Sequence, residues 1–382
     1  MAIKDNSKGV IPPIINGWTI KSIVEPYAIG GMGILHHYIN NDLFAKEIEI
    51  GGTASSSALV KMPKKVPLNP LQKELFENEI NLAIALSSNP KYFPKVLGYN
   101  EGKIQEGDEI PTPYLMMSLE HGVNLRHILS NLEKENKYRR KQDKIQIPLP
   151  ILSYIMSEYC NAIEKIHEKK RLYNDGKPAN TLIRYDGSLS LIDFGISTKI
   201  GESLPPIGLG TTDYNSPEHA VFPPSKIYPD ENEKETTIPK ATPAKLKEKL
   251  EKMKKIKNLN EKSDVYIIGM IAYELATLRN EAAELPEALR LTKEDEINDA
   301  IFELKVIGKK LDYELIQPLR KHRKEWSTNK LERIIRAALN PDCEKRPALG
   351  EVKETFNELK GRYIQDSDVI GFFGSYMHNM PV

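Results

Sequence analysis

The N-terminal part of the chain has apolar positions that alternate with polar ones in short runs, which predicts β-strands. From this pattern we expect strands at residues 18–29, 34–40, 43–50, 94–99 and 112–117. Between the third and the fourth of these strands, apolar residues recur every three or four positions over residues 71–86, which predicts one helix. This part therefore reads as a sheet with a single main helix.

The C-terminal part is dominated by helical periodicity, most clearly at residues 150–169 and 331–339. The two parts predict an α+β, bilobal protein. We place its boundaries in the order small β-rich lobe, connecting hinge, larger mostly helical lobe and tail, at residues 1–117, 118–122, 123–364 and 365–382.

Composition excludes several classes of function. The 54 Lys and Arg residues nearly balance the 53 Asp and Glu residues, so the net charge of +1 indicates no nucleic-acid partner. Only Cys160 and Cys343 are present, as expected in a reducing compartment. The N-terminus lacks the apolar run of a signal peptide, and the longest apolar stretch, residues 265–278, is too short to span a bilayer. We expect a soluble cytoplasmic protein; delivery into another cell stays open.

Three short segments carry the chemistry, and their order matters as much as their composition. They are Tyr-Asn-Asp-Gly-Lys-Pro-Ala-Asn at residues 173–180, Asp-Phe-Gly at residues 193–195, and Gly-Thr at residues 210–211 running into Ser-Pro-Glu at residues 216–218. Phosphoryl transfer from ATP needs a carboxylate to orient the attacking hydroxyl, a nearby Lys, and oxygen ligands for Mg²⁺. These segments contain all of those groups.

In this order and spacing the segments resemble the eukaryotic-type (Hanks-type) Ser/Thr protein kinase superfamily, over about residues 18–359. The resemblance implies a bilobal protein kinase fold with ATP and Mg²⁺ as cofactors. It implies that Asp175 orients the substrate hydroxyl, that Lys177 stabilises charge on the transferring phosphoryl group, and that Asn180 and Asp193 bind the metal.

A glycine loop precedes the second predicted strand. Without a Cβ, glycines let the backbone approach phosphate oxygens, so we expect a nucleotide site at Ile29, Gly30, Gly31 and Gly33. The family has a further glycine where this chain has Ala28, and the form present here is similar to that of bacterial kinases. Taken alone, such a run is also typical of a plain hairpin turn.

Lys46 ends an apolar run and stands in the place of the lysine on the third strand of the family. Because a buried ammonium needs an anion, we expect Lys46 to contact the ATP phosphates and a helix glutamate. Glu79 is our choice, since it shares one face of the predicted helix with three leucines. The alternative is an ordinary glutamate at the edge of the core.

The hinge is expected to hold the adenine. By resemblance Met117 lies behind the ring, the backbone of Ser118, Leu119 and Glu120 pairs with its edge, and Leu182 lies beneath it.

Two positions indicate the substrate class, and a third bears on the mode of activation. Lys177 and Thr211 resemble the Ser/Thr-specific pattern. The family has an Arg where this chain has Asn174, and that Arg pairs with an activating phosphate. We therefore expect activity without phosphorylation between Gly195 and Gly210.

Three positions further along the chain resemble structural elements of the family. Glu218 is expected to form a buried ion pair with Arg346, and Asp264 to hydrogen-bond the backbone of the catalytic loop.

Between Glu218 and Asp264 the chain has an insertion, at about residues 222–260, that contains a lysine-rich helix predicted at residues 244–258. This helix could bind an acidic protein or an anionic membrane surface, or it could be a solvated surface helix.

The sequence thus predicts an enzyme, a Ser/Thr protein kinase that acts on protein substrates. A pseudokinase or docking scaffold that binds nucleotide is the alternative. The oligomeric state is not readable from the sequence.

Overall fold

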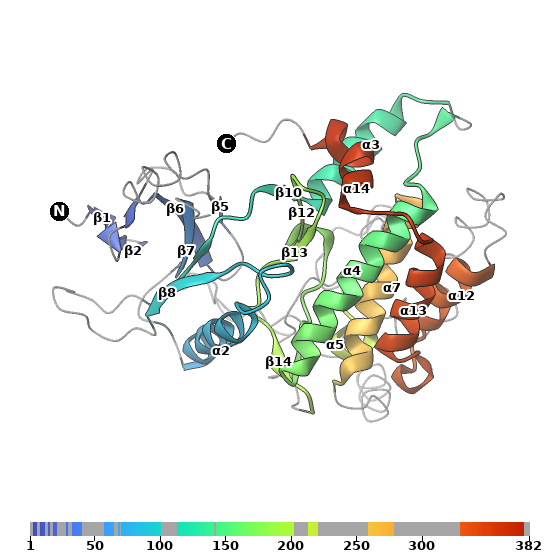
Figure 1. The fold of residues 1–382 in the computed structure, drawn as a ribbon. Helices are drawn as coiled ribbons and strands as arrows, with labels where there is room; N and C mark the ends of the chain where they lie inside the picture. Colours follow the sequence, from blue (N-terminus) through green and yellow to red (C-terminus); the bar gives the residue numbers. More distant parts are fainter. Residues whose placement is uncertain are drawn as a thin grey trace, which may run out of the picture. The chain divides into compact units, whose positions relative to one another are not determined.

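The computed structural model describes residues 3–5, 8–11, 14–15, 18–20, 28–29, 33–39, 57–64, 68, 70–100, 113–140, 143–201, 213–220, 259–278 and 329–377, with only the backbone described up to residue 29. These residues form two compact units (Figure 1). The first comprises Met1–His121 together with Ser190–Gly195, and the second comprises Gly122–Leu189 and Ile196–Val382. The predicted hinge at residues 118–122 spans the chain boundary between them.

The first unit is built on an antiparallel sheet of order β3-β4-β6-β7-β9-β8, with β5 also paired to β6, and a separate hairpin of β1 and β2. The strands are β1 (Ile3–Asp5), β2 (Lys8–Ile11), β3 (Ile14–Ile15), β4 (Trp18–Ile20), β5 (Ala28–Ile29), β6 (Gly33–Ile39), β7 (Ser57–Pro63), β8 (Val96–Asn100) and β9 (Tyr114–Ser118). The strand predicted at residues 18–29 is two strands here, β4 and β5.

One strand of this sheet was not predicted from the sequence. The strand that pairs with β6 is β7, at residues 57–63, whereas the strand predicted at residues 43–50 lies outside the described residues. Strand β7 is central because it also pairs with β9. Its alternate residues Ala58, Val60 and Met62 are buried together with side chains of β6 and β9, as the two-residue period of a strand requires.

The helix of the first unit, α2 (Pro70–Leu86), lies within two residues of its predicted bounds. Its buried positions, among them Leu75, Glu79, Leu82 and Leu86, recur every three or four residues and so share one side of the helix. Glu79 is therefore held on the buried face, as its spacing in the sequence predicts.

The second unit is mainly helical, and α4, α7 and α13 lie side by side in it (Figure 1). Its helices are α3 (Leu125–Lys137), α4 (Leu149–Glu168), α5 (Pro217–Ala220), α7 (Glu261–Thr277), α12 (Asn329–Ala338), α13 (Leu349–Lys360) and α14 (Asp366–Phe373), with short 3₁₀ turns η2 (Pro178–Asn180), η3 (Cys343–Lys345) and η4 (Gly374–Tyr376). Its short strands are β10 (Gly122–Asn124), β11 (Arg171–Leu172), β12 (Thr181–Arg184) and β14 (Thr198–Lys199); β13 (Leu189–Leu191) leads out of the unit. The α+β class predicted from the sequence is confirmed.

Helix α7 is the central element of this unit. Asn260 and Ser263 form a capping box at its N-terminus, and it is buried on nearly every side from Ser263 to Ala276. An apolar helix of this kind needs neighbours all round, and α4, α12 and α13 supply them. No helix among the described residues is long and apolar enough to cross a membrane.

The C-terminal segment docks on the second unit. Val369 and Phe373 of α14 are fully buried, the Tyr154 hydroxyl of α4 donates to Asp366 Oδ1 at 2.9 Å, and Asn131 Nδ2 of α3 donates to the Tyr376 carbonyl at 2.9 Å. The sequence analysis places a tail at residues 365–382 without showing where it binds.

The predicted ion pair between Glu218 and Arg346 is present. Arg346 donates from Nη1 and Nη2 to the two carboxylate oxygens of Glu218, at 2.7 and 2.9 Å, and both side chains are buried. The same guanidinium also donates to the carbonyls of Asn340 and Lys262. One side chain thus joins α5, α7 and the turn before η3.

We predict that Arg346→Met lowers the free energy of unfolding by about 3–5 kcal/mol, because it leaves the Glu218 carboxylate buried without a cation. Arg140→Met is the matched control, since Arg140 pairs with Asp143 while 79% exposed, and it should change stability by less than about 1 kcal/mol. Urea unfolding followed by far-UV circular dichroism measures both. Equal losses in the two variants would contradict the buried pair.

Candidate functional site

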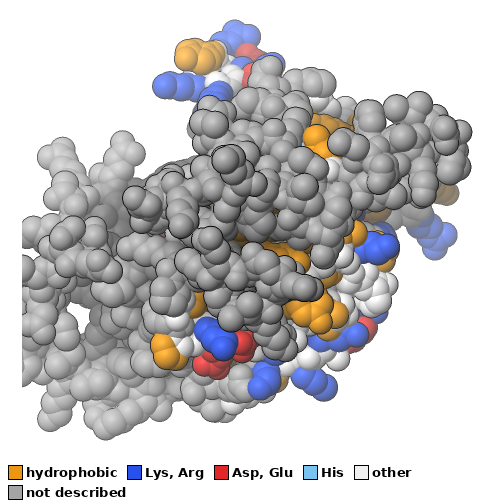
Figure 2. Space-filling view, turned by 90° about the vertical axis from the view of Figure 1, so that its left-hand side faces the viewer, with side chains coloured by type: hydrophobic (Ala, Val, Ile, Leu, Met, Phe, Trp, Pro, Cys, Tyr) orange, Lys and Arg blue, Asp and Glu red, His pale blue; other side chains and the backbone are white. Residues whose placement is uncertain are grey.

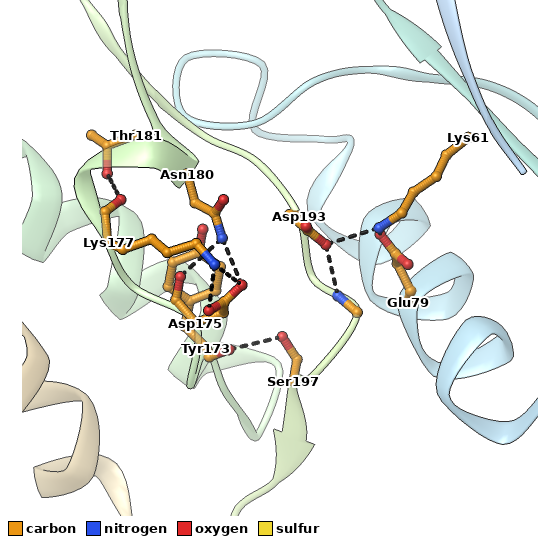
Figure 3. A network of polar contacts seen from close by, with 10 residues as sticks. Lys61, Glu79, Tyr173, Asp175, Lys177, Asn180, Thr181, Asp193 and Ser197 are labelled. Carbon is orange, nitrogen blue, oxygen red and sulfur yellow. Dashed lines mark hydrogen bonds and ion pairs between the residues drawn. The ribbon is translucent and has the colours of Figure 1, made fainter. Parts of the chain in front are cut away.

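A buried lysine lies between two carboxylates in the first unit (Figure 3). Lys61 Nζ lies 2.5 Å from Glu79 Oε1 and 2.8 Å from Asp193 Oδ1. The Lys61 and Glu79 side chains are buried, whereas that of Asp193 is 39% exposed, so a ligand can reach this carboxylate. Strand β7, helix α2 and the Asp-Phe-Gly segment therefore converge on one ammonium group.

The lysine stays charged in this position. Burial alone would lower the pKa of Lys61, but the carboxylates of Asp193 and Glu79 outweigh it and raise the pKa above its usual value. A permanent positive charge of this kind can bind a further anion, such as a phosphate.

This geometry corrects the predicted partner of Glu79. Glu79 does bind a buried lysine, but the lysine is Lys61 and not Lys46, which lies outside the described residues. Both lysines follow apolar residues, so the local pattern does not distinguish them. The position of β7 between β6 and β9 distinguishes them, because it puts Lys61 on the side of the sheet opposite to the core side chains Val60 and Met62.

The end of the glycine loop lies against the stem of this lysine. A Cβ on Gly33 would lie 2.8 Å from the Met62 carbonyl oxygen and 3.2 Å from Lys61 Cγ, so only glycine fits beside β7 here. Of the other residues predicted for this loop, Gly30 and Gly31 lie outside the described residues and Ile29 is described only by its backbone.

The predicted hinge follows the same sheet face. Met117 pairs with Leu59, two residues from Lys61, so the two side chains share one face. The N–H groups of Ser118 and Leu119 donate to the carbonyls of Lys95 and Ser57, at 2.8 and 3.3 Å, so these two donors are engaged within the protein. The Ser118 hydroxyl donates to Glu120 Oε1 at 3.0 Å.

Asp193 is held by its own segment. Its φ of +65° lies in the left-handed region, which Asp adopts more readily than most residues. Phe194 beside it is buried and stacks edge-on against Phe93, with 5.9 Å between ring centroids. The aromatic contact anchors the segment in the first unit and so fixes where the Asp193 carboxylate lies.

A second group of polar residues surrounds Asp175 in the second unit (Figure 3). Lys177 Nζ lies 2.9 Å from both oxygens of Asp175, and Asn180 Nδ2 donates to Asp175 Oδ2 at 2.8 Å and to its backbone carbonyl at 3.0 Å. The tight turn η2 brings Asn180 back over Asp175. The three residues spaced two and five positions apart in the sequence are thus one cluster.

Asn180 fits the role of a magnesium ligand. Because its amide nitrogen faces Asp175, its amide oxygen points away from that carboxylate (Figure 3). Mg²⁺ prefers such hard oxygen donors and keeps several waters, so it needs few protein ligands. Among the described residues no group of three His, Cys, Asp or Glu side chains could hold a metal ion by itself.

The backbone before Asp175 is fixed by α7. Asp264 accepts from the N–H groups of Tyr173 and Asn174, at 2.9 and 3.0 Å, as its position in the sequence predicts. His167 Nε2 lies 2.8 Å from the same carboxylate and was not singled out in the sequence. At Gly176, a Cβ would lie 2.5 Å from both Ile267 Cγ2 and the Tyr159 hydroxyl, so the loop lies tightly on α4 and α7.

A partly buried network that sequence reasoning missed holds the segment before Glu218. Tyr214 accepts from Arg126 Nη2 at 2.5 Å and donates to Glu274 Oε2 at 2.6 Å, while Arg126 also forms an ion pair with Glu274. Glu274 interrupts the longest apolar run of the sequence, and this was the one available sign that a cation or donor meets it.

Two predicted site residues remain. Leu182 lies on β12, paired with Asn124 of β10, and is half-buried. Thr211 lies outside the described residues, as does the helix predicted at residues 244–258.

Surface charge on the described residues is mixed. Figure 2 shows acidic side chains next to basic ones near the lower edge of the face in view, in keeping with the small net charge.

Comparison with known proteins agrees with this geometry. The protein kinase domain family matches residues 103–229, which include Asp175, Asn180 and Asp193. A probable serine/threonine-protein kinase of Corynebacterium efficiens is 27% identical over 213 residues, which are 54% of this chain and 24% of that protein. The probable serine/threonine-protein kinase PknB of Corynebacterium glutamicum is 24% identical over 184 residues, 47% of this chain and 21% of that protein.

A eukaryotic relative gives a similar match. The MAP kinase kinase MKK1/SSP32 of Saccharomyces cerevisiae is 25% identical over 216 residues, 56% of this chain and 38% of that protein. The chain thus spans about a quarter of the length of the corynebacterial relatives and less than half of the yeast one. The predicted resemblance and the bilobal α+β kinase fold are confirmed.

We predict that Asp264→Ala speeds hydrogen exchange at the amides of Tyr173 and Asn174 by about ten- to a hundredfold, because both lose a charged acceptor. Asp264→Asn keeps one acceptor oxygen and should have a smaller effect. Glu261→Ala, in the same helical turn but exposed, is the control. If exchange at these two amides did not change in Asp264→Ala, the loop would be held by other contacts.

Proposed function

We propose that this protein, a member of the eukaryotic-type protein kinase superfamily, transfers the γ-phosphoryl group of ATP to Ser or Thr hydroxyls of protein substrates in the presence of Mg²⁺. The observation that carries the proposal is the buried Lys61 ammonium between Glu79 and Asp193. A lysine held in this way presents a fixed charge to phosphates, which phosphoryl transfer requires.

In this proposal, different side chains bind the phosphates and the metal. Lys61 binds the phosphates, and Glu79 keeps its ammonium in place. Asn180 and Asp193 supply the oxygen ligands for Mg²⁺, which neutralises charge on the phosphates when bound.

On the acceptor side, Asp175 accepts a hydrogen bond from the substrate hydroxyl and orients it for attack. Lys177, within 2.9 Å of Asp175, neutralises charge on the group being transferred.

Serine and threonine are the proposed acceptors for two reasons. Lys177 stands two residues after Asp175, as in the Ser/Thr-specific members that the sequence resembles. The two corynebacterial relatives also carry the name of serine/threonine kinases.

We further propose that activity does not depend on phosphorylation of the segment at residues 195–210. This is supported by Asn174, a neutral residue in the place of the arginine that would read such a phosphate. A contact of the helix predicted at residues 244–258 with an acidic protein or an anionic membrane stays a prediction.

We predict that Lys61→Met lowers the rate of phosphoryl transfer by about 10²–10³-fold, because it removes a preorganised charge at the phosphates. Lys46→Met is the matched variant at the position that the sequence alone favours, and it should keep its activity within about twofold, because Lys61 already supplies the charge beside Glu79. Labelled-ATP turnover with a generic basic protein measures both. A loss confined to Lys46→Met would return the role to Lys46.

We predict that Asp175→Asn lowers kcat by about 10²–10⁴-fold, because the amide cannot accept the hydroxyl proton while it keeps the size of the side chain. Asp143→Asn, at an exposed position, serves as the control and should be fully active. The assay follows label from γ-labelled ATP, and phosphoamino-acid analysis identifies the acceptor. Label on tyrosine would overturn the substrate class. An inactive wild type that still binds ATP would favour a docking scaffold.

A further inference from the structure

Asn174 has an unusual setting immediately before Asp175. Its side chain is fully buried, and its φ of +64° lies in the left-handed region, which asparagine tolerates better than most residues. Its backbone N–H donates to Asp264, so α7 fixes the main chain here.

The side chain of Asn174 binds a different part of the chain. Its Nδ2 donates to the carbonyl of Ile196 at 3.0 Å and to the Thr198 hydroxyl at 2.9 Å. Both acceptors lie in the segment that follows Asp-Phe-Gly. One neutral amide therefore joins the catalytic loop, residues 173–180, to the start of the activation segment.

These two bonds continue a regular antiparallel pairing. Strand β11 pairs with β14 through Arg171 with Lys199 and Leu172 with Thr198. One step outside this ladder, the Ile200 N–H donates to the Lys170 carbonyl at 3.0 Å. The two chain segments thus run side by side in one register.

Beyond Leu172 the same register is kept by side chains. The Ser197 hydroxyl donates to the Tyr173 carbonyl at 3.3 Å, and in the next step the Asn174 amide reaches Ile196. The main-chain ladder ends because the backbone of Tyr173 and Asn174 turns its N–H groups to Asp264. Asn174 is therefore the last link of this pairing, adjacent to Asp175.

Charge decides what this position can do. An arginine here would bring a guanidinium into a fully buried place, where it needs an anion such as a phosphate. The amide of Asn174 needs only a carbonyl and a hydroxyl, and both belong to the chain itself. These hydrogen bonds join the two segments without a phosphate on the chain.

We infer that Asn174 is a positioning residue: its amide holds the start of the activation segment on the catalytic loop and keeps Asp175 oriented without a phosphate. The inference rests on the proposed kinase activity and names the residue that makes this activity independent of phosphorylation. Asn174 itself contacts neither nucleotide nor substrate in this role.

The test uses phosphatase-treated full-length protein and two substitutions suited to the left-handed backbone. Asn174→Gly removes the amide without adding strain, and Asn174→Asp keeps the size but loses the donor to Ile196. Each should lower kcat by about tenfold, while KM for ATP stays unchanged. Thr277→Val, which removes a partly buried hydroxyl hydrogen bond at the far end of α7, is the control and should leave kcat unchanged.

A double variant distinguishes loss of the hydrogen bond between Asn174 and Thr198 from a general destabilisation of the protein. Thr198→Val removes one acceptor of the amide, so its effect should vanish when Asn174 is already glycine. The Asn174→Gly/Thr198→Val protein should then be as active as Asn174→Gly alone. Additive losses would overturn the inference.

Hydrogen exchange provides a readout that does not need catalysis. Amides of residues 196–198 should exchange about tenfold faster in Asn174→Gly than in wild type. Unchanged exchange, or unchanged kcat in both Asn174 variants, would overturn the inference. Loss of wild-type turnover on phosphatase treatment would overturn it too. Wild type that is inactive before treatment would instead overturn the proposed function, with the exchange result still deciding the role of Asn174.

Discussion

The ammonium group of Lys61 is buried, and it can stay charged there only because two carboxylates lie within 2.8 Å of it. This requirement constrains three elements of the first unit at once. Strand β7 must present alternate residues to the core and to the lysine face, α2 must turn Glu79 inward, and the Asp-Phe-Gly segment must reach the same point. Phe194 and Gly33 serve this arrangement, the first by anchoring the segment on Phe93 and the second by leaving room for the lysine stem.

In the second unit a buried carboxylate holds the catalytic loop, as the buried Lys61 ammonium holds together three elements of the first unit. Asp264, at the start of a helix that is buried on nearly every side, accepts hydrogen bonds from two backbone N–H groups of the catalytic loop. The backbone N–H groups of Tyr173 and Asn174 donate to Asp264 of α7. The Tyr173 carbonyl and the Asn174 side-chain amide instead bind the segment after Asp-Phe-Gly. The catalytic loop is thus held from two sides. A neutral amide completes the second contact, where a charged side chain would have required an outside anion.

The parts of the site that could be predicted are those set by short-range order or implied by the family resemblance. The face of α2 identified Glu79, and the motif spacing identified the Asp175 cluster. The Glu218–Arg346 pair and the Asp264 contact with the loop join distant segments, and they could be predicted only through the resemblance to the kinase family. The lysine was assigned wrongly, because Lys46 and Lys61 both follow apolar residues and the choice depends on which strand enters the sheet. The Arg126–Tyr214–Glu274 network was missed, because its members come from three distant segments that share no motif.

By itself, then, the sequence determined the order of the chemical groups, the helix faces and the α+β class, since these follow from spacing along a chain with fixed local geometry. The tertiary structure decided which lysine meets Glu79, where α14 binds, and which groups Asn174 joins. The physical reason is distance along the chain. Lys61 and Asp193 are 132 positions apart, and only the pairing of strands and the burial of α2 determine that their charges meet.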